Sequence, residues 1–296
     1  MSAAEVAVFS DIHGNYEAFR ACFEYCTSRG IDHYLCLGDY VTDCPDTEKT
    51  MELVYILRDY FHARFIRGNR EEYLLNYRNR GETGWHDGSA SGTLLHTYEH
   101  LTKQDLFFFE KLPICDVWEE RGYPPITICH GTPEVSNGLM FRGKRTTKRI
   151  LTACKTPVLL HGHHHEQEAY VERGKLCLNP GSVGVPWHHG GKAQFAILRC
   201  TGGEWVEELI QLEYDREAEF RSFAESGLSS RAPAWAAATM HTLRTGIDQN
   251  QAVMLRATQL CRREQGRADW PDIPEKYWAQ ALMEYRIDLA GRPIAK

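Results

Sequence analysis

The sequence contains no hydrophobic run long enough to cross a membrane. In its 296 residues, no apolar stretch approaches the ~18 residues of a transmembrane helix. The start, "MSAAEVAVFSDIHGN", lacks the basic segment followed by an apolar one that marks a secretory signal. The chain also has no excess of positive charge, since its net charge is −6. A negative net charge disfavours a purely electrostatic nucleic-acid binder. We therefore expect a cytoplasmic protein with no membrane partner and no sequence-specific nucleic-acid partner.

The cysteines also lack a recognisable pattern. The ten cysteines form no C-x-x-C pair, so the usual spacing of zinc and redox sites is absent. Several stand inside apolar runs such as "YLCLG" and "ITICH", and we interpret them as buried, reduced thiols. Internal repeats, low-complexity segments and flexible linkers are also lacking. With 43% apolar and 25% charged residues, the chain fits an ordinary globular protein with one sizeable core.

Short apolar runs alternate with helical patterns in the first part of the chain. The run "VAVFS" is followed by Asn15, a good N-cap, and by "YEAFRACFEYC", whose apolar residues recur at helical spacing. The same alternation returns with "HYLCLG" and "DTEKTMELVYILRDY", and then with "ARFIRG" and "NREEYLLNYR". This pattern predicts β-α units and a largely parallel sheet. Beyond residue 113 the runs read as strands and hairpins, so we expect two sheets packed face to face with helices outside.

From about Asp215 the sequence becomes helical again. We therefore predict two parts, residues 1–214 and a helical C-terminal extension of residues 215–296, which we interpret as an appendage and not as a second catalytic domain. Apolar residues at helical spacing, such as Phe220 with Phe223, indicate that these helices pack on the core or on a second subunit. A homo-oligomer formed through the extension is thus one expectation.

Polar side chains follow the predicted strands, at the point where each strand ends. They are Asp11, His13, Asp39, Asn69, His130, His163 and His165. The carboxyl ends of strands are where open α/β sheets gather their ligands, so these residues should converge on one crevice. Two carboxylates, one amide oxygen and four imidazoles can hold a pair of divalent ions, with Asp39 bridging them. Each residue alone has a simpler interpretation, since Asn69 before "REEYLL" would also make a good helix cap.

The motifs "DIH", "GD", "GN", "HG" and "GHHH" occur in an order that resembles the calcineurin-like metallophosphoesterases. The resemblance spans residues 8–184 and includes "NPGSVG" at 179–184, which is common in the bacterial phosphodiesterase-like branch. It implies an α/β fold with the layers α/β/β/α. It also implies one metal site from Asp11, His13, Asp39 and His165, and a second site from Asp39, Asn69, His130 and His163.

The activity implied by this resemblance is hydrolysis of phosphoesters, with phosphodiesters or nucleotide phosphoanhydrides favoured as substrates. A hydroxide held between two divalent metal ions at Asp39 would attack phosphorus in line. Ligands of this mixed kind accept manganese, iron, zinc or cobalt. Two other interpretations stay open: a phosphomonoesterase or dinucleoside polyphosphate hydrolase, and a non-catalytic binding scaffold such as the retromer-type subunits of the same fold.

The directions of the three consecutive histidine side chains depend on the conformation of the backbone. If the segment is extended, His163 and His165 lie on one side and His164 points away. His164 would then be solvated, hydrogen-bonded to a ligand residue or in contact with substrate. Alternation would place His161 on the ligand side, where we expect it to hydrogen-bond to a ligand residue without being one.

Two positions depart from the family pattern. Many members carry histidine after "GN" and use it near the leaving group, whereas this chain has Arg70. An arginine cannot act as a general acid at neutral pH, but its planar fork suits phosphate oxygens, so we interpret Arg70 as a phosphate clamp. The alternative is a surface arginine paired with Glu71 or Glu72. After "NPGSVGVP", where members often have arginine, stand Trp187 and His188, and an aromatic residue there could stack on a base or cover the pocket.

Overall fold

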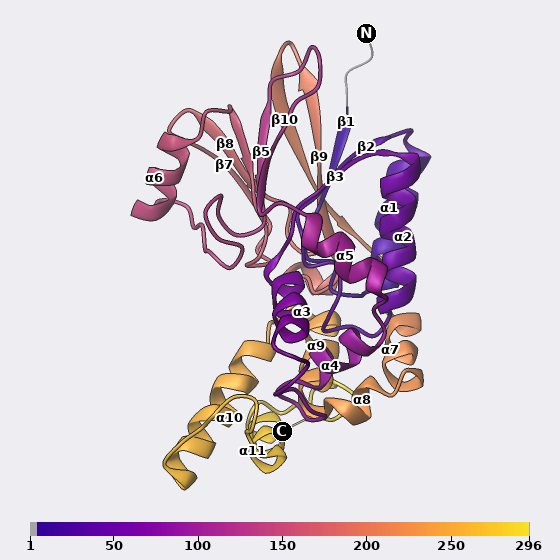
Figure 1. The fold of residues 1–296 in the computed structure, drawn as a ribbon, viewed down its shortest axis with the longest axis vertical. Helices are drawn as coiled ribbons and strands as arrows, with labels where there is room; N and C mark the ends of the chain where they lie inside the picture. Colours follow the sequence, from indigo (N-terminus) through magenta and orange to yellow (C-terminus); the bar gives the residue numbers. More distant parts are fainter. Residues whose placement is uncertain (1–4, 296) are drawn as a thin grey trace.

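Two five-stranded sheets form the centre of the computed structural model, which describes residues 5–295 (Figure 1). Sheet A has the order β10-β9-β1-β2-β3 and consists of β1 (Glu5–Phe9), β2 (His33–Cys36), β3 (His62–Phe65), β9 (Ala193–Thr201) and β10 (Glu204–Leu212). Sheet B has the order β4-β5-β6-β8-β7 and consists of β4 (Cys115–Trp118), β5 (Ile126–Cys129), β6 (Val158–Leu160), β7 (Glu168–Glu172) and β8 (Lys175–Asn179). Each sheet has three adjacent parallel strands, β1-β2-β3 or β5-β6-β8, and antiparallel neighbours.

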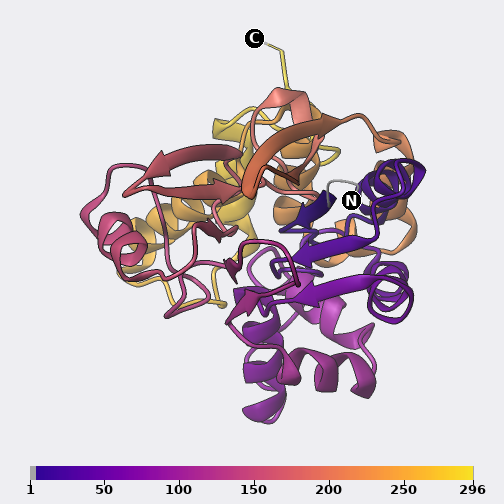
Figure 2. The same ribbon diagram turned by 90° about the horizontal axis from the view of Figure 1, so that it is seen from above.

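Helices cover the outer faces of both sheets. Those of the sandwich are α1 (Tyr16–Ser28), α2 (Thr47–Tyr60), α3 (Asn69–Asn79), α4 (Gly92–Glu99), α5 (Lys103–Lys111) and α6 (Arg145–Ala153), and a 3-10 turn spans His189–Gly191. Helices α1, α2 and α5 bury apolar residues against sheet A, and α6 buries its own against sheet B. From above, the indigo α1 and α2 lie outside one sheet and the pink α6 lies outside the other (Figure 2). The predicted α/β/β/α sandwich is therefore confirmed.

The alternation of side chains along β1 explains why this strand is apolar throughout. Ala7 and Phe9 belong to the cluster under the helices, whereas Val6 and Val8 belong to the cluster between the two sheets. A strand covered on both faces needs apolar residues at every position. The following helix α1 begins where predicted, because the Asn15 side chain accepts a hydrogen bond of 3.0 Å from the backbone N–H of Ala18.

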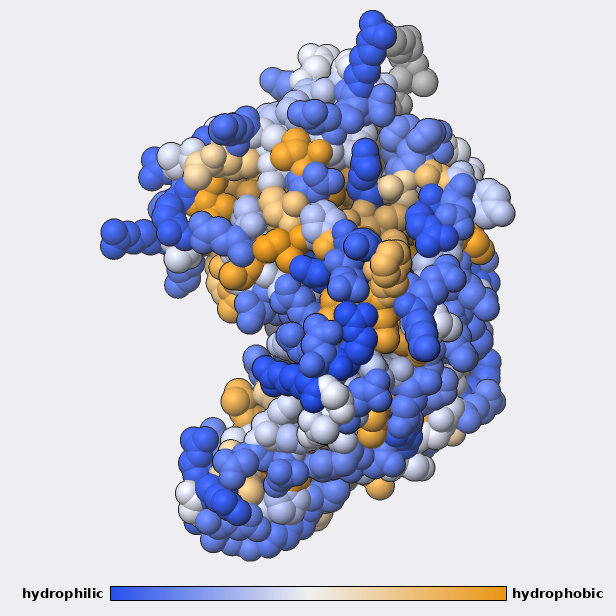
Figure 3. Space-filling model, viewed as in Figure 1, coloured by the Kyte–Doolittle hydropathy of each residue, from blue (hydrophilic) through white to orange (hydrophobic). Residues whose placement is uncertain are grey.

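The C-terminal extension is helical, as predicted. It contains α7 (Arg216–Glu225), α8 (Leu228–Arg231), α9 (Pro233–Thr245), α10 (Asn250–Gln265) and α11 (Glu275–Glu284). These helices lie below the carboxyl ends of the parallel strands of sheet A in Figure 1, and the surface is hollowed between α10 and the sandwich (Figure 3). Cys44 and Val185 of the sandwich are buried in one cluster with Phe223 and Leu243 of the extension. The extension thus packs on the sandwich, while a homo-oligomer and a domain boundary after residue 214 stay predictions.

The cysteines match the expected pattern of single thiols. All ten are free; eight are buried, and Cys115 and Cys154 are half-buried. Within residues 5–295, no helix combines the length and apolar character needed to cross a membrane.

Candidate metal centre

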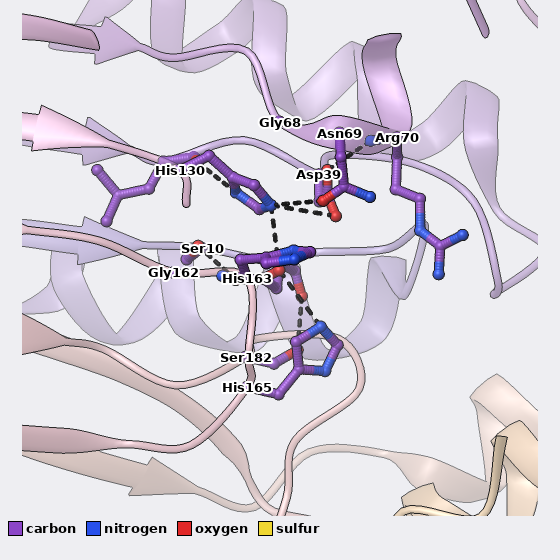
Figure 4. A network of polar contacts seen from close by, with 12 residues as sticks. Ser10, Asp39, Gly68, Asn69, Arg70, His130, Gly162, His163, His165 and Ser182 are labelled. Carbon is purple, nitrogen blue, oxygen red and sulfur yellow. Dashed lines mark hydrogen bonds and ion pairs between the residues drawn. The ribbon is translucent and has the colours of Figure 1, made fainter. Parts of the chain in front are cut away.

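The predicted ligand residues stand at the ends of five strands and converge on one site. Figure 4 shows Asp39, Asn69, His130, His163 and His165 in this site. Asp11 and His13 follow β1, Asp39 follows β2, Asn69 follows β3, His130 follows β5, and His163 and His165 follow β6. Asp11, His13 and Asp39 each have a φ of 54°, and His163 and His165 have φ values of 73° and 55°. Left-handed backbone is uncommon for residues other than glycine, and it concentrates at functional sites where the surrounding structure enforces it.

Asp11, His13 and His165 form a first group of ligand atoms. The two Nε2 atoms of His13 and His165 are 3.0 Å apart. Asp11 Oδ1 lies 3.3 Å from Nε2 of His165 and 3.7 Å from Nε2 of His13. The other oxygen, Oδ2, accepts hydrogen bonds from Ser10 Oγ at 2.5 Å and from the His163 backbone N–H at 3.0 Å. Oδ1 itself is buried with no hydrogen-bond partner, so a cation bound between these three side chains would satisfy it.

Asp39, His130 and His163 form a second group. His130 Nε2 lies 3.3 Å from Asp39 Oδ2 and 3.1 Å from the side-chain oxygen of Asn69. Asp39 Oδ2 is also 3.9 Å from Nε2 of His13 in the first group. The Asp39 carboxylate therefore faces both groups, which is the position that a bridging ligand requires.

Hydrogen bonds behind the imidazoles fix which nitrogen faces the site. Nδ1 of His130 is 2.7 Å from the Leu37 carbonyl oxygen, and Nδ1 of His165 is 2.7 Å from the Val185 carbonyl oxygen. Donation of Nδ1–H to these carbonyls leaves Nε2 as the atom that faces the carboxylates, which is the arrangement of metal-binding histidines generally.

The charges of the site favour a bound cation. Burial alone would lower the pKa of His13, but Asp11 and Asp43 raise it to about 9. Burial likewise opposes the charged form of His130, yet Asp39 and Asp11 raise its pKa to about 10. The same buried carboxylates would attract a divalent ion in place of protons. The donor set of carboxylate, imidazole and amide atoms fits manganese, iron, zinc or cobalt.

Arg70 lies beside this centre, but its partner is not one of those considered from the sequence. Its guanidinium is 2.8 Å from Asp43 Oδ2, and in Figure 4 it lies to one side of the histidine cluster. Arg70 thus pairs with Asp43 and not with Glu71 or Glu72, the alternative from the sequence; Glu72 accepts from Ser136 Oγ at 2.6 Å, and Glu71 accepts from backbone N–H groups. Nε of Arg70 is buried without a hydrogen-bond partner.

Glu71 and Asp43 are two buried acids whose importance the sequence did not reveal. The Glu71 carboxylate accepts hydrogen bonds from the backbone N–H groups of Asp39, Tyr40 and Gly68, at 3.0, 2.9 and 2.8 Å. It thereby joins the ends of β2 and β3, and burial raises its pKa to about 7. The only signal for it was its place three residues after Gly68, at the N3 position of α3, where a glutamate side chain can accept from the backbone N–H of the N-cap residue.

The side chains of His163, His164 and His165 point in the predicted directions, but not because the segment is extended. Residues 161–167 are not extended; the His164 backbone N–H bonds to the Gly162 carbonyl at 3.0 Å, and the residues on either side of His164 are left-handed. His164 points away from the two groups, and its ring lies against Phe141 and His161. The prediction for His161 is wrong, since it lies with His164 and neither ring nitrogen has a hydrogen-bond partner.

Trp187 and His188 lie at the edge of the site. The half-buried Trp187 ring is 5.6 Å from the His165 ring, centroid to centroid. His188 is exposed, and its backbone N–H bonds to the Gly246 carbonyl of the extension at 2.6 Å. Trp187 is thus placed beside the candidate ligand His165, while its contact with a substrate stays a prediction.

Comparison with known proteins agrees with this geometry. The sequence pattern of the calcineurin-like phosphoesterase superfamily domain matches residues 5–203. An uncharacterised protein of Methanocaldococcus jannaschii is 24% identical over 248 residues, which cover 79% of this chain and 96% of the relative. A hypothetical protein from Pyrococcus horikoshii has a similar structure, with a TM-score of 0.68 and 22% identity over 84% of this chain and 100% of that one. A metallophosphoesterase from Sphaerobacter thermophilus follows with a TM-score of 0.61 and 22% identity, over 78% and 98% of the two chains. The family pattern spans more than half of the sequence and includes all seven candidate ligands, and the chain therefore belongs to the calcineurin-like phosphoesterase superfamily.

Proposed function

We propose that this protein is a metal-dependent phosphoesterase that cleaves phosphodiesters or nucleotide phosphoanhydrides. The observation that carries the proposal is the convergence of seven side chains from five strand ends on one site, in which Asp11 Oδ1 is buried without a hydrogen-bond partner. A buried carboxylate of this kind is costly unless a cation compensates it.

Two divalent metal ions would be held by these side chains. Asp11, His13, Asp39 and His165 would hold one ion, and Asp39, Asn69, His130 and His163 would hold the other. Bound ions supply positive charge that polarises phosphoryl oxygens and lowers the pKa of water. Asp39 faces both groups, so its charge serves both sites.

The protein's own residues orient the substrate. Arg70 lies at the start of α3, and its guanidinium keeps donors free beyond the one paired with Asp43, so it can also contact phosphate oxygens. Trp187 beside His165 offers an aromatic surface at the edge of the site. A phosphorylated small molecule or nucleotide would satisfy both contacts.

A binding scaffold without chemistry is the competing function. It would not require a complete set of ligand side chains with Nε2 atoms held toward two carboxylates, so the site supports the enzyme.

The test is a screen of the chelator-stripped protein with manganese, iron, zinc or cobalt added separately. An aryl phosphodiester, an aryl phosphomonoester and a nucleoside triphosphate serve as substrates. We expect metal-dependent hydrolysis, fastest for the diester or the anhydride. Two bound ions per chain without turnover of any substrate would favour the scaffold.

A further inference from the structure

The Asp43 carboxylate joins the metal centre to the C-terminal extension. Its Oδ2 lies 3.1 Å from Nδ1 of His13 and 2.8 Å from the guanidinium of Arg70. Its Oδ1 accepts a hydrogen bond of 2.8 Å from the indole Nε1–H of Trp235, on α9. The side chain of Asp43 is 7% exposed. One buried carboxylate therefore has a candidate metal ligand and the candidate phosphate clamp on one oxygen, and a residue of the extension on the other.

The position of this indole is set by the core of the extension. Trp235 packs against the cluster that includes Val253, Tyr277 and Trp278, and its ring centroid lies 6.5 Å from that of Trp278. The N–H that reaches Asp43 is thus held by a core built from α9, α10 and α11, against which Ala90 of the sandwich also packs.

The extension also packs against the residue that hydrogen-bonds to His165, the second histidine of the Asp11–His13–His165 group. The Val185 carbonyl, which accepts from His165 Nδ1, belongs to a residue buried against Phe223, Met240 and Leu243. By contrast, His130 of the Asp39–His130–His163 group hydrogen-bonds through Nδ1 to the Leu37 carbonyl, which lies within the sandwich. The extension therefore contacts the residues behind the Asp11–His13–His165 group.

We propose that Trp235 is a positioning residue of the metal centre: its indole N–H fixes the Asp43 carboxylate, which holds the His13 imidazole and the Arg70 guanidinium in place. Without this N–H, Asp43 Oδ1 would be buried without a donor. The carboxylate would rotate so that His13 and Arg70 share its two oxygens, and both side chains would leave their present positions. The role in phosphate binding rests on the proposed function, whereas the role in metal binding rests on the contacts alone.

The experiment compares Trp235→Phe with Trp278→Phe in the full-length protein. Both changes remove one indole N–H and keep an aromatic ring in the same core, but Nε1 of Trp278 is buried without a hydrogen-bond partner. Manganese is titrated into the chelator-stripped protein by calorimetry, and inorganic phosphate is then titrated into the metal-loaded protein. For Trp235→Phe we expect one manganese step to weaken about tenfold, the lower end of the loss seen when the partner of a ligand is itself removed, and phosphate to bind about tenfold more weakly. Trp278→Phe should match the unmodified protein in both titrations.

Equal titration curves for Trp235→Phe and Trp278→Phe would overturn the proposal. Asp43→Asn, alone and combined with Trp235→Phe, gives a second measurement that depends on the same carboxylate. If the indole acts through Asp43, the double variant binds manganese as weakly as Asp43→Asn, and additive losses contradict this. Because the titrations need no turnover, they separate this proposal from the proposed function: a protein that binds manganese but hydrolyses nothing fails only the latter.

Discussion

At the residue scale, the candidate ligands could be predicted because each follows a predicted strand, and all of these strands except β3 before Asn69 are largely buried. Asp43 and Glu71 could not, because their importance arises from tertiary contacts with His13 and with three backbone N–H groups. The turn at His163–His165 was also hidden from the sequence, since a positive φ is uncommon at any residue other than glycine and the triplet does not show which histidines adopt it.

Asp39 provides the first prediction at this scale. Asp39→Asn removes the charge that faces both groups of ligands, so we expect metal binding to weaken at both sites and turnover to fall on the order of 10²-fold or more. Elemental analysis and a phosphodiester assay on the same sample measure this. Two tightly bound ions in the variant would refute a bridging role.

His164→Ala is the matched change on the other face of the same turn. The His164 ring lies against Phe141 and His161, away from the two groups. We therefore expect the metal content of this variant to equal that of the unmodified protein. Loss of an ion would show that the triplet contributes different ligands from those proposed.

The presence of Arg70 leads to a prediction about how the rate depends on the leaving group. Since arginine cannot protonate the departing oxygen, aryl phosphodiesters and phosphoanhydrides should react much faster than alkyl phosphomonoesters, with a steep dependence of rate on leaving-group pKa. Arg70→His would flatten this dependence, because general acid catalysis is worth roughly 10²- to 10⁴-fold. Arg70→Ala would mainly weaken phosphate binding, by about tenfold. Rates for a series of substituted phenyl esters test this, and a shallow dependence in the unmodified protein would mean that another group supplies the proton.

At the scale of elements, the spacing of apolar residues predicted the β-α units of the first part and the helices after Asp215. Helices α4 and α5 were not assigned from the sequence, although Thr102 and Asp105 form a capping box at the start of α5. Sequence periodicity also did not show how α7 meets the sandwich. This contact buries Glu219, whose two carboxylate oxygens have no hydrogen-bond partner.

Glu219 gives a prediction about stability and pH. Burial, with Asp46 and Glu17 nearby, raises the pKa of Glu219 well above its ordinary value of 4.5. Folding thus favours the protonated form, so its contribution to stability is greatest below pH 4.5 and is lost as the pH rises toward the folded-state pKa. Glu219→Gln should stabilise the protein by about 1–3 kcal/mol at pH 8, with a smaller gain at pH 5. Urea unfolding at both values measures this.

Glu217→Gln is the control for this change, because Glu217 lies on the same helix with a side chain that is 75% exposed. We expect it to leave the free energy of unfolding nearly unchanged. An equal gain from both variants, or a gain from Glu219→Gln that does not depend on pH, would contradict the account of a buried charge.

At the scale of the whole molecule, the extension is part of the structure around the site. Truncation after Tyr214 would expose Cys44 and Val185, which now share a cluster with Phe223 and Leu243. We expect a destabilised product with weakened metal binding, measured by thermal unfolding and calorimetry. A soluble product with unchanged manganese affinity would show that the sandwich holds the centre by itself.

The most direct test of the central claim is a titration of the chelator-stripped protein with manganese, in which hydrolysis of an aryl phosphodiester is followed at each step. If Asp39 joins two metal sites that act together, activity should rise until two equivalents per chain are bound and should return to zero when a chelator is added. Full activity in the stripped protein, or two bound equivalents without hydrolysis, would contradict the account.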